Sequence, residues 1–367
     1  MKNTQHQLIN DSQIIGDLCA RASQVRVVGL DTEFMREKAY FAKLCLLQMS
    51  IEENYYLIDT LTLSEDDEAY QCMAKLIADE KIIKIVHSSS QDVEVLSQFF
   101  NAVPKAIFDT QIAAGFCGYD GQIGYANLVL SVCDVELDKS QTRTNWLQRP
   151  LSQQQLDYAI NDVVYLQALY EKFLEELKSR ERQTWFNEEC AAIVQASIDN
   201  QDVNQAYRRM NGSHLLPRNQ QLLVFLANLR EQNAQLSDKP RPWILKDVDI
   251  YTLANALPTT HKELFSLDVT AGFVRRNANQ IIDYVQNLES NPTRLWSAVQ
   301  PLTSQQKALV KKCSQKLNEI AENSNVSRNL IANRKDIESY ISGRGAKFED
   351  GWRAQVVGDQ LREFIDK

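Results

Sequence analysis

The residues best suited to chemistry are two acids that lie two positions apart after the first strongly apolar stretch. Asp31 and Glu33 follow the run Val25–Leu30. Residues i and i+2 of a β-strand point to the same face, so both carboxylates should project together from a strand that is otherwise buried. Two neighbouring carboxylates repel each other unless a cation lies between them. The pair therefore predicts a divalent metal site with oxygen ligands, as in enzymes that move phosphoryl groups.

Further acids lie at junctions where they can join this pair. Asp92 is in the first turn of a helix-like segment that follows the apolar run Ile82–Val86. Tyr158 and Asp162 are four residues apart, which places them on one face of a helix. Taken singly, each pattern also arises at a solvated strand end or on a half-buried helix. Their order, and their positions at the ends of predicted elements, favour one common site.

These segments resemble the DEDD superfamily of 3′-to-5′ exonucleases, in its tyrosine-bearing branch. The matching motifs are DxE at Asp31 and Glu33, HxxxxD at His87 and Asp92, and YxxxD at Tyr158 and Asp162. The segment from Thr142 to Leu151 narrows the resemblance to the ribonuclease D family. The resemblance implies hydrolysis of RNA from its 3′ end to nucleoside 5′-monophosphates. The implied substrates have an unpaired 3′ end and include tRNA precursors and other small structured RNAs.

The same resemblance implies the roles of the site residues. Two divalent ions, Mg²⁺ or Mn²⁺, are expected on Asp31, Glu33, Asp92 and Asp162, and Tyr158 completes the catalytic set. A tyrosine phenol is mostly protonated at neutral pH, so orienting the attacking water suits Tyr158 better than removing a proton. His87 is expected to have a structural role and not to act as the general base.

Residues close to the motifs are candidates for contact with the 3′ end of the RNA. They are Phe34, Gln91, Arg143, Asn145, Trp146 and Arg149. Trp146 is a candidate stacking surface for a base, and Phe34 is a candidate wedge against the terminal base. Each of the six has an alternative interpretation as a packing residue or a helix cap.

Composition restricts the class of protein. The 367 residues suggest two or three domains, and the chain shows neither a leader-like apolar segment nor a run long enough to cross a membrane. Its seven cysteines are scattered singly, which fits neither a disulfide framework nor a zinc site. We therefore expect a soluble, cytoplasmic protein, with no membrane and no obligate protein partner, and we assume a monomer.

Charge is distributed unevenly along the chain. Residues 1–200 carry 17 Lys and Arg against 30 Asp and Glu, whereas residues 201–367 carry 23 against 18. The first part, which contains the predicted metal site, is thus acidic, and the second is mildly basic and could bind RNA. A charged soluble protein can show the same split without binding RNA.

The pattern of elements predicts an α/β domain followed by helical domains. Residues 1–205 alternate between strand-like and helix-like segments, which indicates a ribonuclease-H-like exonuclease domain with a mixed sheet flanked by helices. Ser152 and Gln155 form a capping-box pattern that should begin a helix running to about residue 177. Residues 212–290 resemble the HRDC domain, and residues 295–367 resemble it more faintly, as a second, diverged HRDC-like domain.

Two other functions fit the same sequence. One is a DNA 3′-to-5′ exonuclease of the Werner or proofreading type, because two-metal chemistry does not need the 2′-hydroxyl. The other is a catalytically silent RNA-binding protein on the same scaffold. The HRDC-like segments favour RNA, and the five filled catalytic positions argue against a silent site.

Overall fold

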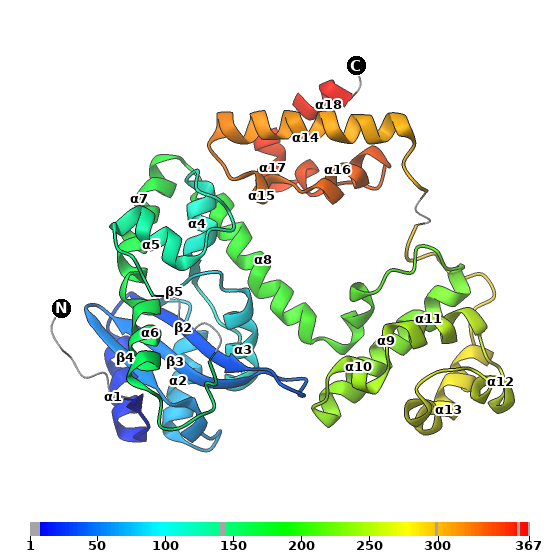
Figure 1. The fold of residues 1–367 in the computed structure, drawn as a ribbon, viewed down its shortest axis with the longest axis horizontal. Helices are drawn as coiled ribbons and strands as arrows, with labels where there is room; N and C mark the ends of the chain where they lie inside the picture. Colours follow the sequence, from blue (N-terminus) through cyan, green and yellow to red (C-terminus); the bar gives the residue numbers. More distant parts are fainter. Residues whose placement is uncertain (1–7, 139–143, 298–299, 358–359, 366–367) are drawn as a thin grey trace. The chain divides into compact units, whose positions relative to one another are not determined.

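The computed structural model of the protein describes residues 8–138, 144–297, 300–357 and 360–365 (Figure 1). The chain divides into two compact units. The first unit combines Met1–Met35, Lys43–Gln195 and Leu302–Lys367. The second combines Arg36–Ala42 and Ala196–Pro301. These boundaries differ from the three ranges expected from the sequence, and the three-domain division stays a prediction.

The first unit is built on a mixed six-stranded sheet. Its strands are β1 (Leu8–Ile9), β2 (Val27–Met35), β3 (Lys43–Ile51), β4 (Asn54–Ile58), β5 (Ile83–Val86) and β6 (Ile107–Asp109). The strand order is β1-β4-β3-β2-β5-β6. The pairs β2–β3 and β3–β4 are antiparallel, whereas β1–β4, β2–β5 and β5–β6 are parallel. The predicted mixed sheet, with antiparallel neighbours beside the Asp31 strand, is confirmed.

Helices pack around this sheet. They are α1 (Ser12–Ala22), α2 (Glu68–Ala78), α3 (Ser90–Phe100), α4 (Thr110–Phe116), α5 (Tyr125–Cys133), α6 (Gln153–Val164), α7 (Leu166–Ser179) and α8 (Gln183–Gln201), with the 3-10 turn η1 (Thr60–Thr62). Helices α3, α6 and α7 all contact β2. The strand that carries Asp31 and Glu33 is therefore in contact with α3, which carries Asp92, and with α6, which carries Asp162.

Helix α6 begins as the sequence predicts but ends earlier. The Ser152 hydroxyl accepts the Gln155 N–H, and the Gln155 side chain accepts the Ser152 N–H, so the capping box is confirmed. The predicted continuous helix to about residue 177 is wrong, because α6 ends at Val164 and α7 starts at Leu166. Tyr165 lies between them, and its N–H donates to the Tyr125 hydroxyl at 3.2 Å.

The C-terminal helices share a hydrophobic core with helices α4, α5, α7 and α8 of the first unit. They are α14 (Ser304–Ser324), α15 (Arg328–Ile331), α16 (Arg334–Ile341), η3 (Lys347–Glu349), α17 (Gly351–Val357) and α18 (Gln360–Ile365). Trp352 is buried against Phe116, with ring centroids 4.8 Å apart. Arg353 forms an ion pair with Glu189 at 2.7 Å. This packing anchors the tail helices to α4 and α8.

The second unit is helical. Its elements are η2 (Val203–Arg209), α9 (Pro217–Ser237), α10 (Arg241–Ile244), α11 (Asp247–Ala256), α12 (His261–Phe265) and α13 (Ala271–Gln286). Tyr40, from the short segment Arg36–Ala42, is part of its hydrophobic core. The helical character predicted for this region is confirmed.

Cysteine pairing corrects one expectation. Cys19 of α1 and Cys72 of α2 form a disulfide, with their Cα atoms 6.1 Å apart. The sequence indicated no disulfide because 53 residues separate the two cysteines and nothing local shows that α1 and α2 are neighbours.

Within the described residues, no helix combines the length and apolar character needed to cross a membrane.

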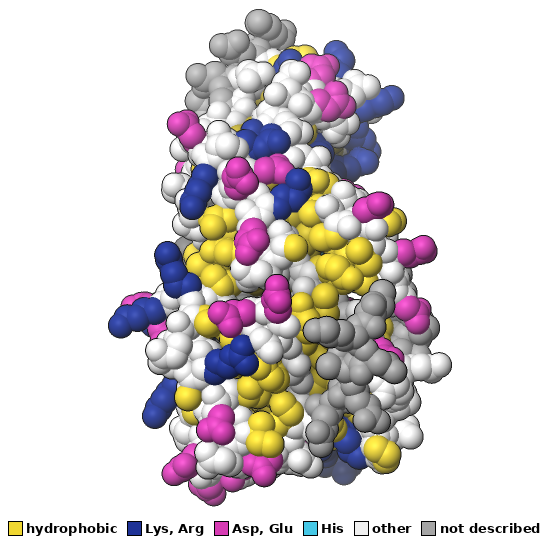
Figure 2. Space-filling model, turned by 90° about the vertical axis from the view of Figure 1, so that its left-hand side faces the viewer, with side chains coloured by type: hydrophobic (Ala, Val, Ile, Leu, Met, Phe, Trp, Pro, Cys, Tyr) yellow, Lys and Arg dark blue, Asp and Glu magenta, His cyan; other side chains and the backbone are white. Residues whose placement is uncertain are grey.

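Surface charge is mixed. Figure 2 shows one face of the molecule on which lysines and arginines are scattered among acidic and hydrophobic side chains. On this face, the described side chains form no continuous basic surface.

Candidate metal centre

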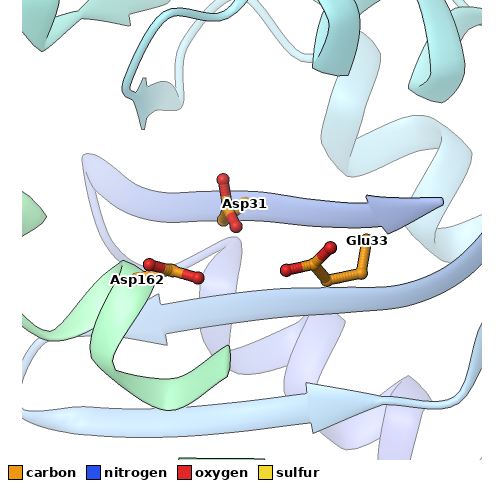
Figure 3. Close-up of side chains that lie close together, drawn as sticks. All are labelled: Asp31, Glu33 and Asp162. Carbon is orange, nitrogen blue, oxygen red and sulfur yellow. The ribbon is translucent and has the colours of Figure 1, made fainter. Parts of the chain in front are cut away.

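Three carboxylates converge beside strand β2 (Figure 3). Asp31, Glu33 and Asp162 each offer one oxygen, and these oxygens all lie within 4.8 Å of one another. Asp31 and Glu33 come from β2 and Asp162 from α6, as the i, i+2 and i, i+4 spacings predicted. Three oxygen ligands this close together fit a hard divalent cation, since Mg²⁺ and Mn²⁺ prefer carboxylates.

Asp92 lies near this group but outside the set of three. It is in the first turn of α3, is 8% exposed, and accepts a hydrogen bond from the Thr32 hydroxyl. Its charge contributes to raising the pKa of Asp31, Glu33 and Asp162, so it belongs to the same electrostatic site.

Burial and repulsion from neighbouring acids raise the pKa of all four acids, and for Asp92 the repelling neighbour is Asp109. Burial is the largest cause in each case. The pKa of Glu33 rises to about 9 and those of Asp92 and Asp162 to about 7, while that of Asp31 lies well above its usual value. Carboxyls whose charge is unfavourable in the absence of a cation are suited to binding one.

Tyr158 lies beside the cluster. It is half-buried on α6, and its hydrogen bond to Asp162 lowers the pKa of that carboxyl, opposing the effect of burial. The tyrosine and the aspartate thus face the same space, one helical turn apart.

The ends of α3 and α4 are fixed by a residue that the sequence reading missed. Asp109 accepts hydrogen bonds from the N–H groups of Ser88 and Ser89 at 3.1 and 2.8 Å. It also caps α4 through the N–H of Gln111 at 2.8 Å. One buried carboxylate therefore places the start of the helix that carries Asp92. An acid at the end of the short apolar run Ile107–Phe108 was the available signal.

His87 has the structural environment expected for it. Its Nδ1 lies 2.9 Å from the Thr110 hydroxyl and its Nε2 lies 3.0 Å from the Ile123 carbonyl. Burial lowers its pKa. Both ring nitrogens are occupied by these contacts, which link His87 to the start of α4 and to the segment before α5.

Two candidates for RNA contact have structural roles. Trp146 is only 2% exposed and packs in a core cluster, 6.1 Å from the Tyr158 ring, so its assignment as a stacking surface is wrong. The sequence around Trp146 gives no indication that the ring is covered by other side chains. Arg149 forms an ion pair with Asp59 at 2.6 Å and donates to the carbonyls of Cys45, Trp146 and Gln148, each at 2.8 Å.

The other four candidates have different positions. Gln91 and Asn145 are exposed, and Phe34 is half-buried next to Glu33. The Asn145 side chain accepts the N–H of Leu147 at 3.0 Å, so it also stabilises the local turn. Arg143 lies outside the described residues. RNA contact by Phe34, Gln91, Asn145 and Arg143 stays a prediction.

Comparison with known proteins identifies relatives along the whole chain. Residues 6–178 match the family model described as 3′-5′ exonuclease, and residues 219–285 match the HRDC domain. A ribonuclease D from Shewanella sp. (strain ANA-3) is 32% identical, over 98% of this chain and 94% of the relative. One from Jannaschia sp. (strain CCS1) is also 32% identical, over 94% and 91%.

A solved structure gives the same result for the fold. The crystal structure of Escherichia coli RNase D, described as an exoribonuclease involved in structured RNA processing, aligns with a TM-score of 0.80 and 25% identity, covering 99% of both chains. The catalytic core of RRP6 from Trypanosoma brucei aligns with a TM-score of 0.52 at 21% identity and shares the fold.

Proposed function

Because this chain belongs to the ribonuclease D family and is a 3′-to-5′ exoribonuclease, we propose that it hydrolyses RNA with two divalent metal ions, Mg²⁺ or Mn²⁺, held by its four clustered acids, Asp31, Glu33, Asp92 and Asp162. The observation that supports this most strongly is the convergence of Asp31, Glu33 and Asp162 on one point. Asp31 would contribute to both ions, Glu33 and Asp162 to one of them, and Asp92 to the other. The products would be nucleoside 5′-monophosphates.

The bound ions and the side chains around them would have different roles in the hydrolysis. Bound ions would lower the pKa of the attacking water and offset the charge that develops on the phosphate. The Tyr158 hydroxyl, adjacent to Asp162, is positioned to orient that water. The buried surroundings of Asp92 and Asp31 strengthen the electrostatic interactions at the site, since fewer water molecules screen them.

The proposed substrate is RNA with an unpaired 3′ end, including precursors of tRNA and other small structured RNAs. The RNase D of Escherichia coli, described as acting in structured RNA processing, supports this choice. We place the reaction in the cytoplasm, as is consistent with the bacterial relatives, and we assign no obligate protein partner. We propose that residues 219–285, which match the HRDC domain, bind the structured part of the RNA.

The test compares matched RNA and DNA oligonucleotides, each 5′-labelled and carrying an unpaired 3′ tail, with Mg²⁺, Mn²⁺ or EDTA. Stepwise shortening of RNA that EDTA abolishes is the expected result. A tRNA precursor with a 3′ extension should then be shortened from its 3′ end, and the shortening should stop near the folded part of the RNA. Equal shortening of DNA, or shortening that persists in EDTA, would contradict the proposal.

Two substitutions on helix α6 test whether Asp162 is part of the metal site, one at Asp162 and a control at Asp157. Asp162→Asn should abolish degradation while RNA binding persists, because it removes a proposed metal ligand. Asp157→Asn changes an exposed acid of the same helix, whose carboxylate accepts from Gln153, and should degrade RNA at the normal rate. Full activity of the Asp162→Asn variant would contradict the proposed metal site.

A further inference from the structure

A buried amide lies directly opposite Asp31 in the sheet. Gln48 of β3 is 0% exposed, and the register of the antiparallel pair β2–β3 aligns it with Asp31. Paired residues on adjacent strands point to the same face, so the Gln48 side chain is on the face that carries the carboxylate cluster. Its neighbours Leu46, Leu47 and Met49 are all apolar and fully buried.

Only one end of this amide has a partner. The Gln48 Nε2 group donates to Asp31 Oδ2 at 3.3 Å. The Gln48 Oε1 atom is buried and has no hydrogen-bond partner among the described residues. Burying a polar group without a partner is unfavourable, so an apolar side chain would be easier to accommodate here. The amide is therefore a poor choice for packing alone, and its one contact is with a proposed metal ligand.

The contact belongs to a pattern around the cluster. Three of the four acids each accept a hydrogen bond from an uncharged side chain: Asp92 from Thr32, Asp162 from Tyr158 and Asp31 from Gln48. A lysine or arginine in such a place would neutralise the carboxylate and compete with a divalent cation. An uncharged donor orients the carboxylate and leaves its charge available.

We propose that Gln48 is a positioning residue: its amide holds one oxygen of Asp31, orients that carboxylate toward Glu33 and Asp162, and so sets the affinity of the site for a divalent cation. The inference rests on the proposed metal-dependent function. In this proposal Gln48 belongs to the metal site although it neither binds the metal nor contacts the RNA. Groups that orient metal ligands typically change affinity or activity by about 10- to 100-fold when removed.

The test substitutes Gln48→Met, which keeps the length of the side chain and removes the donor. The affinity for Mn²⁺ is measured by isothermal titration calorimetry on the full chain without RNA, together with kcat and KM on a short RNA. The dissociation constant for Mn²⁺ should rise, and kcat should fall, by about 10- to 100-fold. The KM for RNA should change little, and the melting temperature should not fall, because an unpaired buried oxygen is removed.

The matched control is Gln98→Met. Gln98 also has a buried Oε1 atom without a partner, and its Nε2 also donates to a carboxylate at 3.3 Å, but that carboxylate is Glu94. This variant should bind Mn²⁺ normally. If Gln48→Met does not fold, Gln48→Asn replaces it, since its shorter amide draws the donor away from Asp31.

The outcomes separate the two proposals. Wild-type protein that binds Mn²⁺ and degrades RNA, with a Gln48 variant that matches it in both, would overturn the positioning role alone. Wild-type protein that degrades RNA without any divalent cation would overturn the metal-dependent function itself. A loss of Mn²⁺ affinity of the same size in Gln98→Met would mean that the effect is not specific to Asp31.

Discussion

Burial and other acids are the main causes that raise the pKa of Asp31, Glu33 and Asp162, and no basic side chain of the described residues is among those causes. Without a cation, the folded protein holds protons on these groups that the unfolded chain releases. The metal and the protons therefore compete for the same oxygens, and metal binding should release protons.

This competition predicts a pH dependence of stability. The pKa values of Glu33 and Asp162 are raised to about 9 and about 7, whereas unfolded acids titrate at roughly pH 4. Between these limits the metal-free native state binds more protons than the unfolded state, so its stability falls as the pH rises. Thermal melts from pH 5 to 9 should show this decline in EDTA and a rescue by Mn²⁺ that grows with pH. A Glu33→Gln variant should have a flatter profile in EDTA; an unchanged profile would contradict the assignment.

Tyr158 gives a prediction for the chemical step. Tyr158→Phe removes the hydroxyl beside Asp162 and keeps the ring that packs near Trp146. We expect kcat to fall about 10- to 100-fold, with stability and the KM for RNA retained. Single-turnover kinetics on a 5′-labelled RNA measures this directly. Tyr170→Phe, on the following helix, is the control and should react normally, and full activity in Tyr158→Phe would remove the water-orienting role.

At the scale of elements, the entry into α6 depends on Arg149. Its guanidinium links the buried Asp59, which follows β4, to the carbonyl of Cys45 in β3 and to the turn at Trp146. A planar group with several donors can satisfy all of these acceptors at once. The turn before α6 is thereby fixed to the sheet.

Removing this guanidinium should destabilise the fold. Arg149→Ala leaves the Asp59 carboxylate buried without its partner, and we expect a loss of about 3 to 5 kcal/mol in the free energy of unfolding. Arg149→Lys should recover part of this, because it restores the charge but not the several donors. Urea denaturation measures both. A stable Arg149→Ala protein with a KM for RNA raised tenfold would instead support the prediction that Arg149 contacts RNA.

At the scale of the whole molecule, the chain passes between its two units more than once. It leaves the first unit after Met35, returns at Lys43, and leaves again after Gln195. The short excursion Arg36–Ala42 is bound within the second unit, where Asp238 accepts the N–H groups of Tyr40 and Phe41 at 3.0 Å each. The segment that follows strand β2 thus contributes to the packing of the helical unit.

Glu231 is central to that packing. It is 0% exposed, pairs with Arg241 at 2.6 Å and with Arg209 at 3.3 Å, and accepts from the Tyr40 hydroxyl. Burial alone would raise its pKa, but the hydrogen bonds from Arg241 and Tyr40 lower the pKa below its usual value. Its contribution to stability is therefore present above the unfolded pKa of about 4.5 and is lost as the pH falls through the folded value.

Neutralising Glu231 should weaken the second unit. Glu231→Gln is expected to cost about 2 to 4 kcal/mol, below the largest effects of breaking buried pairs because both arginines reach solvent. Urea denaturation followed by tryptophan fluorescence measures the change. Asp199→Asn, which disturbs an exposed ion pair with Arg208 in the same unit, should cost less than about 1 kcal/mol. Equal losses in the two variants would contradict a central role for Glu231.

The sequence by itself determined the elements and the acids that they carry. The spacings of Asp31 with Glu33 and of Tyr158 with Asp162 follow from the geometry of a strand and a helix, so they need no tertiary information. The capping box at Ser152 is equally local. The family resemblance then linked motifs that are far apart in the chain.

Outside these motifs, only the tertiary structure decided which distant residues meet. The contact of Gln48 with Asp31 spans 17 residues, that of Arg149 with Asp59 spans 90, and that of Tyr40 with Glu231 spans 191. The burial of Trp146, which removed it as a stacking surface, also depends on such contacts. Periodicity shows which face of an element is buried, but it carries no information about the partner that covers it.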